Sequence, residues 1–125
     1  MTAGLERVER IVAELPEAGR VDIEQWGGEP TFRVRGKNFV FANADGSRIS
    51  VKLPKTEAEA VVAADPQVGP TGYGLGRAGW VSVTIPARTG AARWREIEEW
   101  IRTSYVLVAP KTLARQVLDR DTGGR

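Results

Sequence analysis

Residues 31–53 read TFRVRGKNFVFANADGSRISVKL and predict three short β-strands joined by two tight turns. Aromatic and β-branched residues alternate with polar ones through much of this segment, which is typical of strands with one buried face. Glycine-containing sequences at 36–37 and 44–46 are suited to the two turns. We call residues 31–53 the ribbon, and we expect helices from the rest of the chain to cover it.

The faces of the ribbon depend on the lengths of its two turns. A two-residue turn at 36–37 places four apolar side chains on one face, namely Phe32, Val34, Phe39 and Phe41. At the second turn, a two-residue reading would pair Phe41 with Ser50 and direct Ile49 away from that face. A three-residue loop at 44–46, with Gly46 at positive φ, instead pairs Phe41 with Ile49 and buries both. Because a one-residue slip moves every side chain to the other face, we predict the three-residue loop.

The opposite face of the ribbon is predicted to be cationic. Residues 31–55 hold six basic residues and a single acid, a net charge of +5, whereas the whole chain carries +2. Arg and Lys suit the solvated face of any antiparallel sheet, but such faces usually interleave both signs of charge. The lack of interleaved acids favours contact with phosphates. The predicted nucleic-acid-binding residues are Arg33, Arg35, Lys37, Arg48 and Lys52.

The composition excludes several classes of chemistry. The 125 residues suit one domain, 1–125, with a modest core. The chain has no Cys and no His, which excludes disulfides, zinc sites of the usual type, imidazole acid–base catalysis and thiol nucleophiles. The serines lack a recognisable activating base. We therefore expect no enzyme, no cofactor and no metal site. With no apolar run of membrane-spanning length and no signal peptide, we expect a cytoplasmic monomer that does not enter a membrane.

Helical and strand patterns flank the ribbon. Amphipathic or capped helices are predicted at 2–15, from Thr56 to about 65, at about 91–105, and from Pro110 onwards, with a frayed tail at 119–125. The helix at 91–105 carries an inner stripe of Trp94, Ile97, Ile101, Ser104 and Tyr105. Further strands are predicted at 20–26 and 80–85. The short turns between consecutive strands favour an antiparallel meander.

A glycine-rich segment, PQVGPTGYGLGRAG at 66–79, is predicted to be a long loop with little structure of its own. Residues 74–79 match the dinucleotide-binding fingerprint literally. That fingerprint requires a preceding strand and a following helix, whereas here a loop precedes and a strand follows. We therefore reject nucleotide binding. An alternative role for the loop is to frame a site for a protein or a small ligand, together with Trp80 or Trp100.

Several segments in order resemble the MmcQ/YjbR family: FRVRGKNFVFAN, RISVKLP, a short acidic helix, GYGLGRAGWVSVTI and WREIEEWIRTSYVLVAPKTL. The resemblance spans about residues 5–118, and its specific elements are the 36–37 turn, Gly79-Trp80 and Ser104-Tyr105. It implies an α+β fold like that of frataxin, with an antiparallel sheet of about five strands covered on one face by N- and C-terminal helices. It also implies a double-wing arrangement and DNA binding, and it offers no catalytic residues to carry over.

These observations lead to one expected function and one alternative. We expect non-enzymatic, weak and phosphate-directed binding of DNA by the basic sheet face. The alternative is a protein- or small-ligand-binding domain that uses the loop at 66–79 and the neighbouring tryptophans.

Overall fold

A computed structural model of the chain describes residues 3–23, 29–72 and 74–123. The described helices are α1 (Ala3–Ala13), α2 (Lys55–Ala64), the short 3-10 helix η2 (Leu75–Ala78), α3 (Ala91–Val108) and α4 (Lys111–Gly123). The strands are β1 (Ala18–Ile23), β2 (Glu29–Val34), β3 (Lys37–Ala42), β4 (Arg48–Lys52), β5 (Val68–Pro70) and β6 (Trp80–Thr84).

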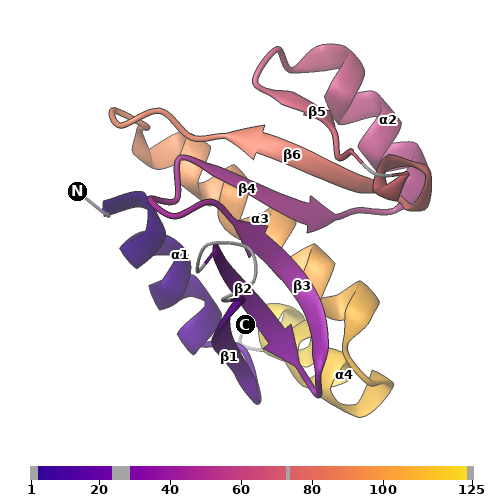
Figure 1. Cartoon of the computed structure of the whole chain (residues 1–125). Coiled ribbons are helices and arrows are strands. Elements are labelled where there is room, and N and C mark those ends of the chain that lie inside the picture. The colour runs from indigo at the N-terminus through magenta and orange to yellow at the C-terminus, as the bar shows by residue number, and fades with distance from the viewer. Residues whose placement is uncertain (1–2, 24–28, 73, 124–125) are drawn as a thin grey trace.

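The six strands form one antiparallel sheet in the order β1-β2-β3-β4-β6-β5 (Figure 1). The predicted α+β class and antiparallel sheet are confirmed, with six strands rather than about five. The additional strand is β5, which lies inside the segment predicted to have little structure of its own. The helical tail also extends further than predicted, because α4 continues to Gly123.

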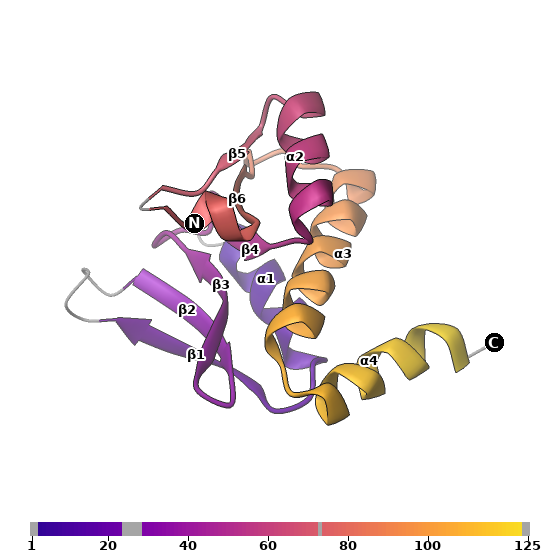
Figure 2. The ribbon, with the colours of Figure 1, turned by 90° about the vertical axis from the view of Figure 1, so that its right-hand side faces the viewer.

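Helices cover one face of the sheet. In Figure 2 the sheet lies to one side of α3, and α4 turns away from the C-terminal end of α3 and projects from the body. The predicted inner stripe of α3 is confirmed, because Trp94, Ile97, Ile101, Ser104 and Tyr105 are all buried. A helical period of 3.6 residues places these positions on one side, where they meet β3 and β4. We call the other side of the sheet the open face.

The first hairpin turn lies one residue earlier than predicted. Val34 pairs with Lys37, so the two turn residues are Arg35 and Gly36 instead of 36–37. Arg35 has a φ of 51° and Gly36 a φ of 81°. Positive φ at both central residues is the geometry of a type I′ turn, whose twist matches that of the flanking strands. The predicted turn had Gly36 as its first residue, whereas Gly36 is the second and Arg35, a residue with a side chain, also adopts positive φ.

A β-bulge in β3 changes the faces of the ribbon. Arg33 pairs with Asn38 but Phe32 pairs with Val40, so Phe39 is an extra residue. Phe39 and Val40 are both buried, and the ring of Phe39 meets that of Tyr105 edge to face, with the ring centroids 5.3 Å apart. The alternation of side chains is therefore inverted beyond this point.

The inversion explains why the predicted second loop is wrong. Ala42 pairs with Ile49 and Phe41 pairs with Ser50, and residues 43–47 connect the two strands instead of the predicted 44–46. Ile49 is buried as predicted, but Phe41 is on the open face and does not pair with it. Paired residues share a face, so Ile49 lies on the same face as Ala42. Without the bulge, Ala42 would be on the solvent face; the bulge turns Ala42 to the core and buries Ile49 with it.

The hydroxyl group of Ser104 bridges β3 and β4 at the point where their backbone pairing ends. The β3–β4 pairing ends at Val40 and Val51, and Ser104 of α3 takes the next position. Its hydroxyl donates to the carbonyl oxygen of Phe39 at 2.6 Å and accepts from the backbone N–H of Lys52 at 2.8 Å. Since buried backbone polar groups need partners, Ser104 compensates for the ladder bonds that the bulge removes.

We predict that Ser104→Ala lowers the free energy of unfolding by about 2 kcal/mol or more, because two backbone groups lose their shared partner. Chemical denaturation measures this loss. Ser50→Ala is the control, since its hydroxyl bonds the side chain of Ser82 instead of the backbone. Equal losses in the two variants would contradict the structural role of Ser104.

We predict that Gly46→Ala is clearly more destabilising than Gly36→Ala. Both glycines have positive φ, so both substitutions incur strain of about 1 kcal/mol. A Cβ at Gly46 would also lie 2.4 Å from the backbone nitrogen of Leu5, whereas nothing lies within 4 Å at Gly36. This overlap should add about 1–3 kcal/mol, measured by denaturant unfolding. Similar stabilities would show that the loop does not press against α1.

Candidate nucleic-acid interface

The open face is built from alternate residues of four central strands. Cross-strand pairs place the following side chains on it: Thr31, Arg33, Phe41, Arg48, Ser50, Lys52, Trp80 and Ser82. Their neighbours along the strands, such as Ile49, Val51, Val81 and Val83, point to the helices and are buried. The site is therefore the reverse side of the core-forming strands.

A hollow of about 860 Å³ lies on this face, between the strands and residues 70–72 and 75. Phe41, Ser50 and Ser82 line it from the strands, and Thr71 and Leu75 line it from the segment after β5. Arg48 and Glu29 lie among its lining residues. We call this feature the open-face hollow. Part of the glycine-rich segment therefore forms a wall of this hollow.

Three hydroxyl groups meet beside the hollow. The hydroxyl of Ser82 lies 2.9 Å from that of Ser50 and 3.1 Å from that of Thr71. Each hydroxyl has one proton to donate and two lone pairs to accept with. The three groups therefore bond to one another and keep spare acceptor capacity for a polar ligand.

An aromatic ring stands next to these hydroxyls. Phe41 is half-buried, and its ring centroid is 5.2 Å from that of Trp80, with the planes tilted by 60°. Trp80 itself is 8% exposed, so its ring packs beside that of Phe41 and has little contact with solvent. Trp100, the other tryptophan expected near a site, is in the core on α3 beneath Arg93. It takes no part in the open-face hollow.

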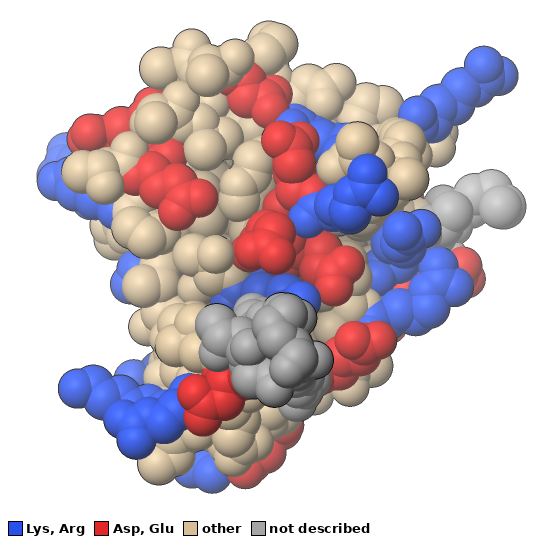
Figure 3. Space-filling view, turned by 180° about the vertical axis from the view of Figure 1, so that it is seen from behind, with Lys and Arg blue, Asp and Glu red and all other residues tan. Residues whose placement is uncertain are grey.

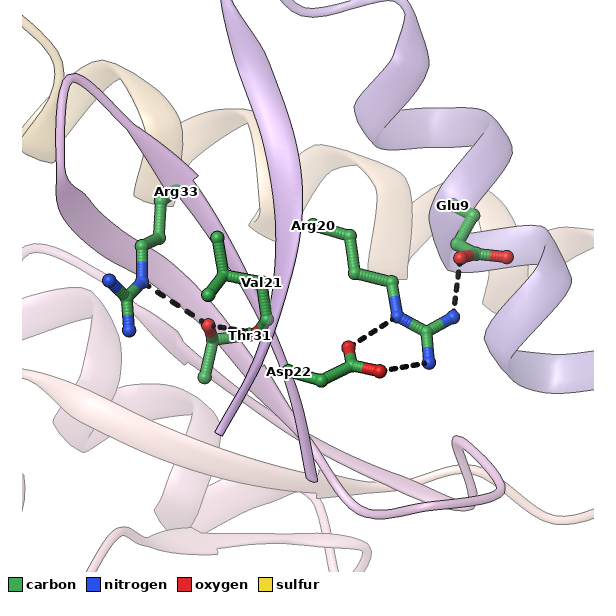
Figure 4. A network of polar contacts seen from close by, with 6 residues as sticks. All are labelled: Glu9, Arg20, Val21, Asp22, Thr31 and Arg33. Carbon is green, nitrogen blue, oxygen red and sulfur yellow. Dashed lines mark hydrogen bonds and ion pairs between the residues drawn. The ribbon is translucent and has the colours of Figure 1, made fainter. Parts of the chain in front are cut away.

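Three of the five predicted cationic residues lie together on the open face. Arg33 is half-buried, and its Nε donates to Thr31 Oγ1 at 3.3 Å, while that hydroxyl donates to the carbonyl of Val21 at 2.6 Å (Figure 4). Arg48 and Lys52 occupy the two ends of β4. Within the part of the chain that the structure describes, no ion pair involves these three side chains. Their charges are available to an anionic partner.

The other two predicted residues lie apart from this group. Arg35 is in the hairpin turn, where its Nε donates to Glu17 Oε1 at 2.5 Å and its Nη2 to Glu17 Oε2 at 3.0 Å. The hydrogen bond with Arg35 lowers the pKa of the Glu17 carboxyl, and the same bond raises the pKa of Arg35. Lys37 is exposed at the start of β3 and pairs with Val34, a residue of the buried face. The predicted face of five residues is therefore a group of three.

Phe41, Ser82 and Thr71 are site residues that sequence reasoning did not assign. Phe41 was placed in the core because the bulge at Phe39 carries no glycine to signal it. Thr71 comes to the site because β5 pairs with β6 and turns the glycine-rich segment over the sheet. Residues 74–79 lie between the short strand β5 and the strand β6, which begins at Trp80, so a strand and not a helix follows them.

The face covered by helices differs in its charge. Figure 3, seen from behind, shows acidic and basic side chains interspersed over that surface.

In the described ranges, no three His, Cys, Asp or Glu residues lie close enough to hold a metal ion. None of the helices that the structure describes is both long and apolar enough to cross a membrane.

These features define a class of protein: a small α+β protein with helices on one side of an antiparallel sheet and a basic, hollowed surface on the other. The chain belongs to the YjbR family, whose family model matches residues 13–107. This match confirms the resemblance inferred from the sequence.

The chain is also similar to a solved structure from Deinococcus radiodurans. This is the crystal structure of protein DR2400, described with the domain DUF419. The TM-score is 0.69 at 24% sequence identity, and the match covers 90% of this chain and 86% of that chain. At this level of identity the likeness shows a shared fold. Among curated proteins, none matches this chain.

We predict that the carboxyl of Glu17 titrates below its ordinary value of about 4.3 and that Arg35→Gln returns it toward that value. The cause is the ion pair with Arg35, which favours the charged carboxylate. A pH titration followed by NMR measures both values. A Glu17 titration that Arg35→Gln leaves unchanged would show that Arg35 is free for other partners.

Proposed function

We propose that the protein binds nucleic acid through the open face, without sequence specificity and mainly through phosphate groups. The observation that supports this proposal most directly is the grouping of Arg33, Arg48 and Lys52 on one face without ion-pair partners among the described residues. Lys and Arg contacts to phosphates supply affinity and positioning, and they carry no sequence information.

The spacing of these cations suits an extended anionic chain. Arg48 and Lys52 are four residues apart on β4, which corresponds to about 13 Å along a strand. Arg33 lies on β2, on the other side of β3. A nucleic-acid backbone that crosses the open face can therefore contact cations from two different β-strands, β2 and β4.

A second candidate function rests on a different observation. The open-face hollow combines an aromatic ring, three hydroxyls and one arginine in a concave surface of about 860 Å³. Ligand sites usually have this composition, with an apolar lining and a few polar groups that fix orientation. We propose binding of a small ligand or a protein there as the alternative.

A salt titration tests the proposed function. If three phosphates are neutralised, log K for random duplex DNA should fall with log salt with a slope of about −2.7. Reversal of two cations, Arg33→Glu with Arg48→Glu, should weaken binding to all sequences alike and reduce the magnitude of the slope by about 2. Circular dichroism confirms that the double variant is folded.

A matched reversal elsewhere is the control for net charge. Arg95→Glu with Arg115→Glu changes two exposed residues of α3 and α4 and should have much less effect. Equal weakening by both double variants would mean diffuse electrostatics instead of a site. Absence of any DNA binding at low salt would overturn the proposal and favour the alternative.

A further inference from the structure

We infer that the preferred partner of the open face is a single strand of nucleic acid, with one base placed in the open-face hollow against Phe41. The inference rests on the proposed phosphate-directed binding and adds the class of nucleic acid. Four features of the site support it: its concave shape, its aromatic ring, its hydroxyl groups and the position of its charges.

The concave shape favours a base that is free of its partner strand. Proteins that read a duplex insert a helix or a ribbon of two strands into a groove, so their contact surface projects. Here the contact surface recedes between the strands and the wall formed by Thr71 and Leu75. A base enters such a recess only after leaving the stack, which costs least in a single strand. The volume of about 860 Å³ lies within the range of small-molecule pockets, roughly 300–1,000 Å³.

The aromatic ring is held in place for stacking. Phe41 pairs with Thr31 on one side and with Ser50 on the other, and Trp80 contacts its ring. Its side chain is therefore held in place before binding, so binding costs little further conformational entropy. Stacking on aromatic side chains contributes to sequence-independent binding of single strands, because every base has an aromatic face. The register with Ser50 directs this ring to the open face, although its neighbours Val40 and Ala42 are buried.

The hydroxyl groups suit any base. Ser50, Ser82 and Thr71 can each donate or accept, and their protons rotate to match the partner. A cluster of this kind can bond the edge of a purine or a pyrimidine without a fixed pattern of donors and acceptors. We therefore expect weak preferences among bases.

The charges indicate where the phosphates lie. Arg48 lines the hollow, and Arg33 and Lys52 are on the same face beyond it. Glu29, the acid among the residues that line the hollow, repels phosphates from its own position. The single strand of nucleic acid would thus direct one base toward Phe41. Its phosphate backbone would lie near Arg48, Arg33 and Lys52.

Substitution of Phe41 separates stacking from charge. Wild type and variants are titrated by fluorescence anisotropy against a labelled oligothymidylate and a labelled duplex, each at the same series of salt concentrations. We expect wild type to prefer the single strand, and Phe41→Leu to reduce that affinity about fivefold or more. Affinity for the duplex and the salt slope for the single strand should stay unchanged, because leucine keeps the apolar contact and alters no phosphate contact.

Two further variants complete the test. Phe41→Tyr keeps the ring and should restore single-strand binding, whereas Leu107→Ala, a change to an exposed apolar residue of α3, should have no effect. Equal binding of single strand and duplex, or an equal loss for both with Phe41→Leu, would overturn this inference and leave phosphate-directed binding intact. If reversal of Arg33 and Arg48 has no effect on either nucleic acid, the proposed function itself fails.

Discussion

The hydroxyl group of Ser104 is the contact on which the arrangement of this sheet depends. It is fully buried and bonds one backbone group from each of β3 and β4, where the two strands separate. The adjacent Tyr105 contacts Phe39 with its ring and donates its hydroxyl to the carbonyl of Pro16 at 2.6 Å. Two consecutive residues of α3 therefore secure both the β-bulge and the connection between α1 and β1. Since buried polar groups without partners are costly, these bonds also favour a single register.

The β-bulge links the core to the candidate site. Phe39 is the additional residue, and its ring contacts that of Tyr105. The insertion shifts the alternation of the following side chains by one residue, so that Val40 faces the helices and Phe41 faces away. The same change orients β4 through its pairing with β3, so that Ser50 and the cations at the ends of β4 join Phe41. An aromatic ring, hydroxyls and positive charges are thus brought to one face by a single additional residue in the interior of the fold.

Much of the fold could be predicted from the sequence, because the relevant signals are local. The apolar period of α3 identified its buried stripe, and alternation within the ribbon identified its strands. The bulge could not be predicted, because no glycine or break in hydrophobicity marks Phe39 as an extra residue. The ion pair of Arg35 with Glu17 joins residues eighteen positions apart in the sequence. The local charge count therefore treated Arg35 as an unpaired cation. Three of the five cations named from the sequence therefore share the open face, while the hollow and the aromatic ring beside them required the tertiary structure.

The bulge in β3 also affects how this chain can be compared with its relatives. A family member without the additional residue would have its interior and surface positions in the opposite order from Phe39 onward. An ungapped alignment of the two chains would then match Phe41 with a core position and Val40 with a surface position. In such an alignment, Phe41 would be compared with the conserved core residues of the relative. Val40, which is in the core, would be compared with its variable surface residues. Comparisons within the family therefore need a gap at Phe39, set by the backbone pairing, before any position is interpreted in evolutionary terms.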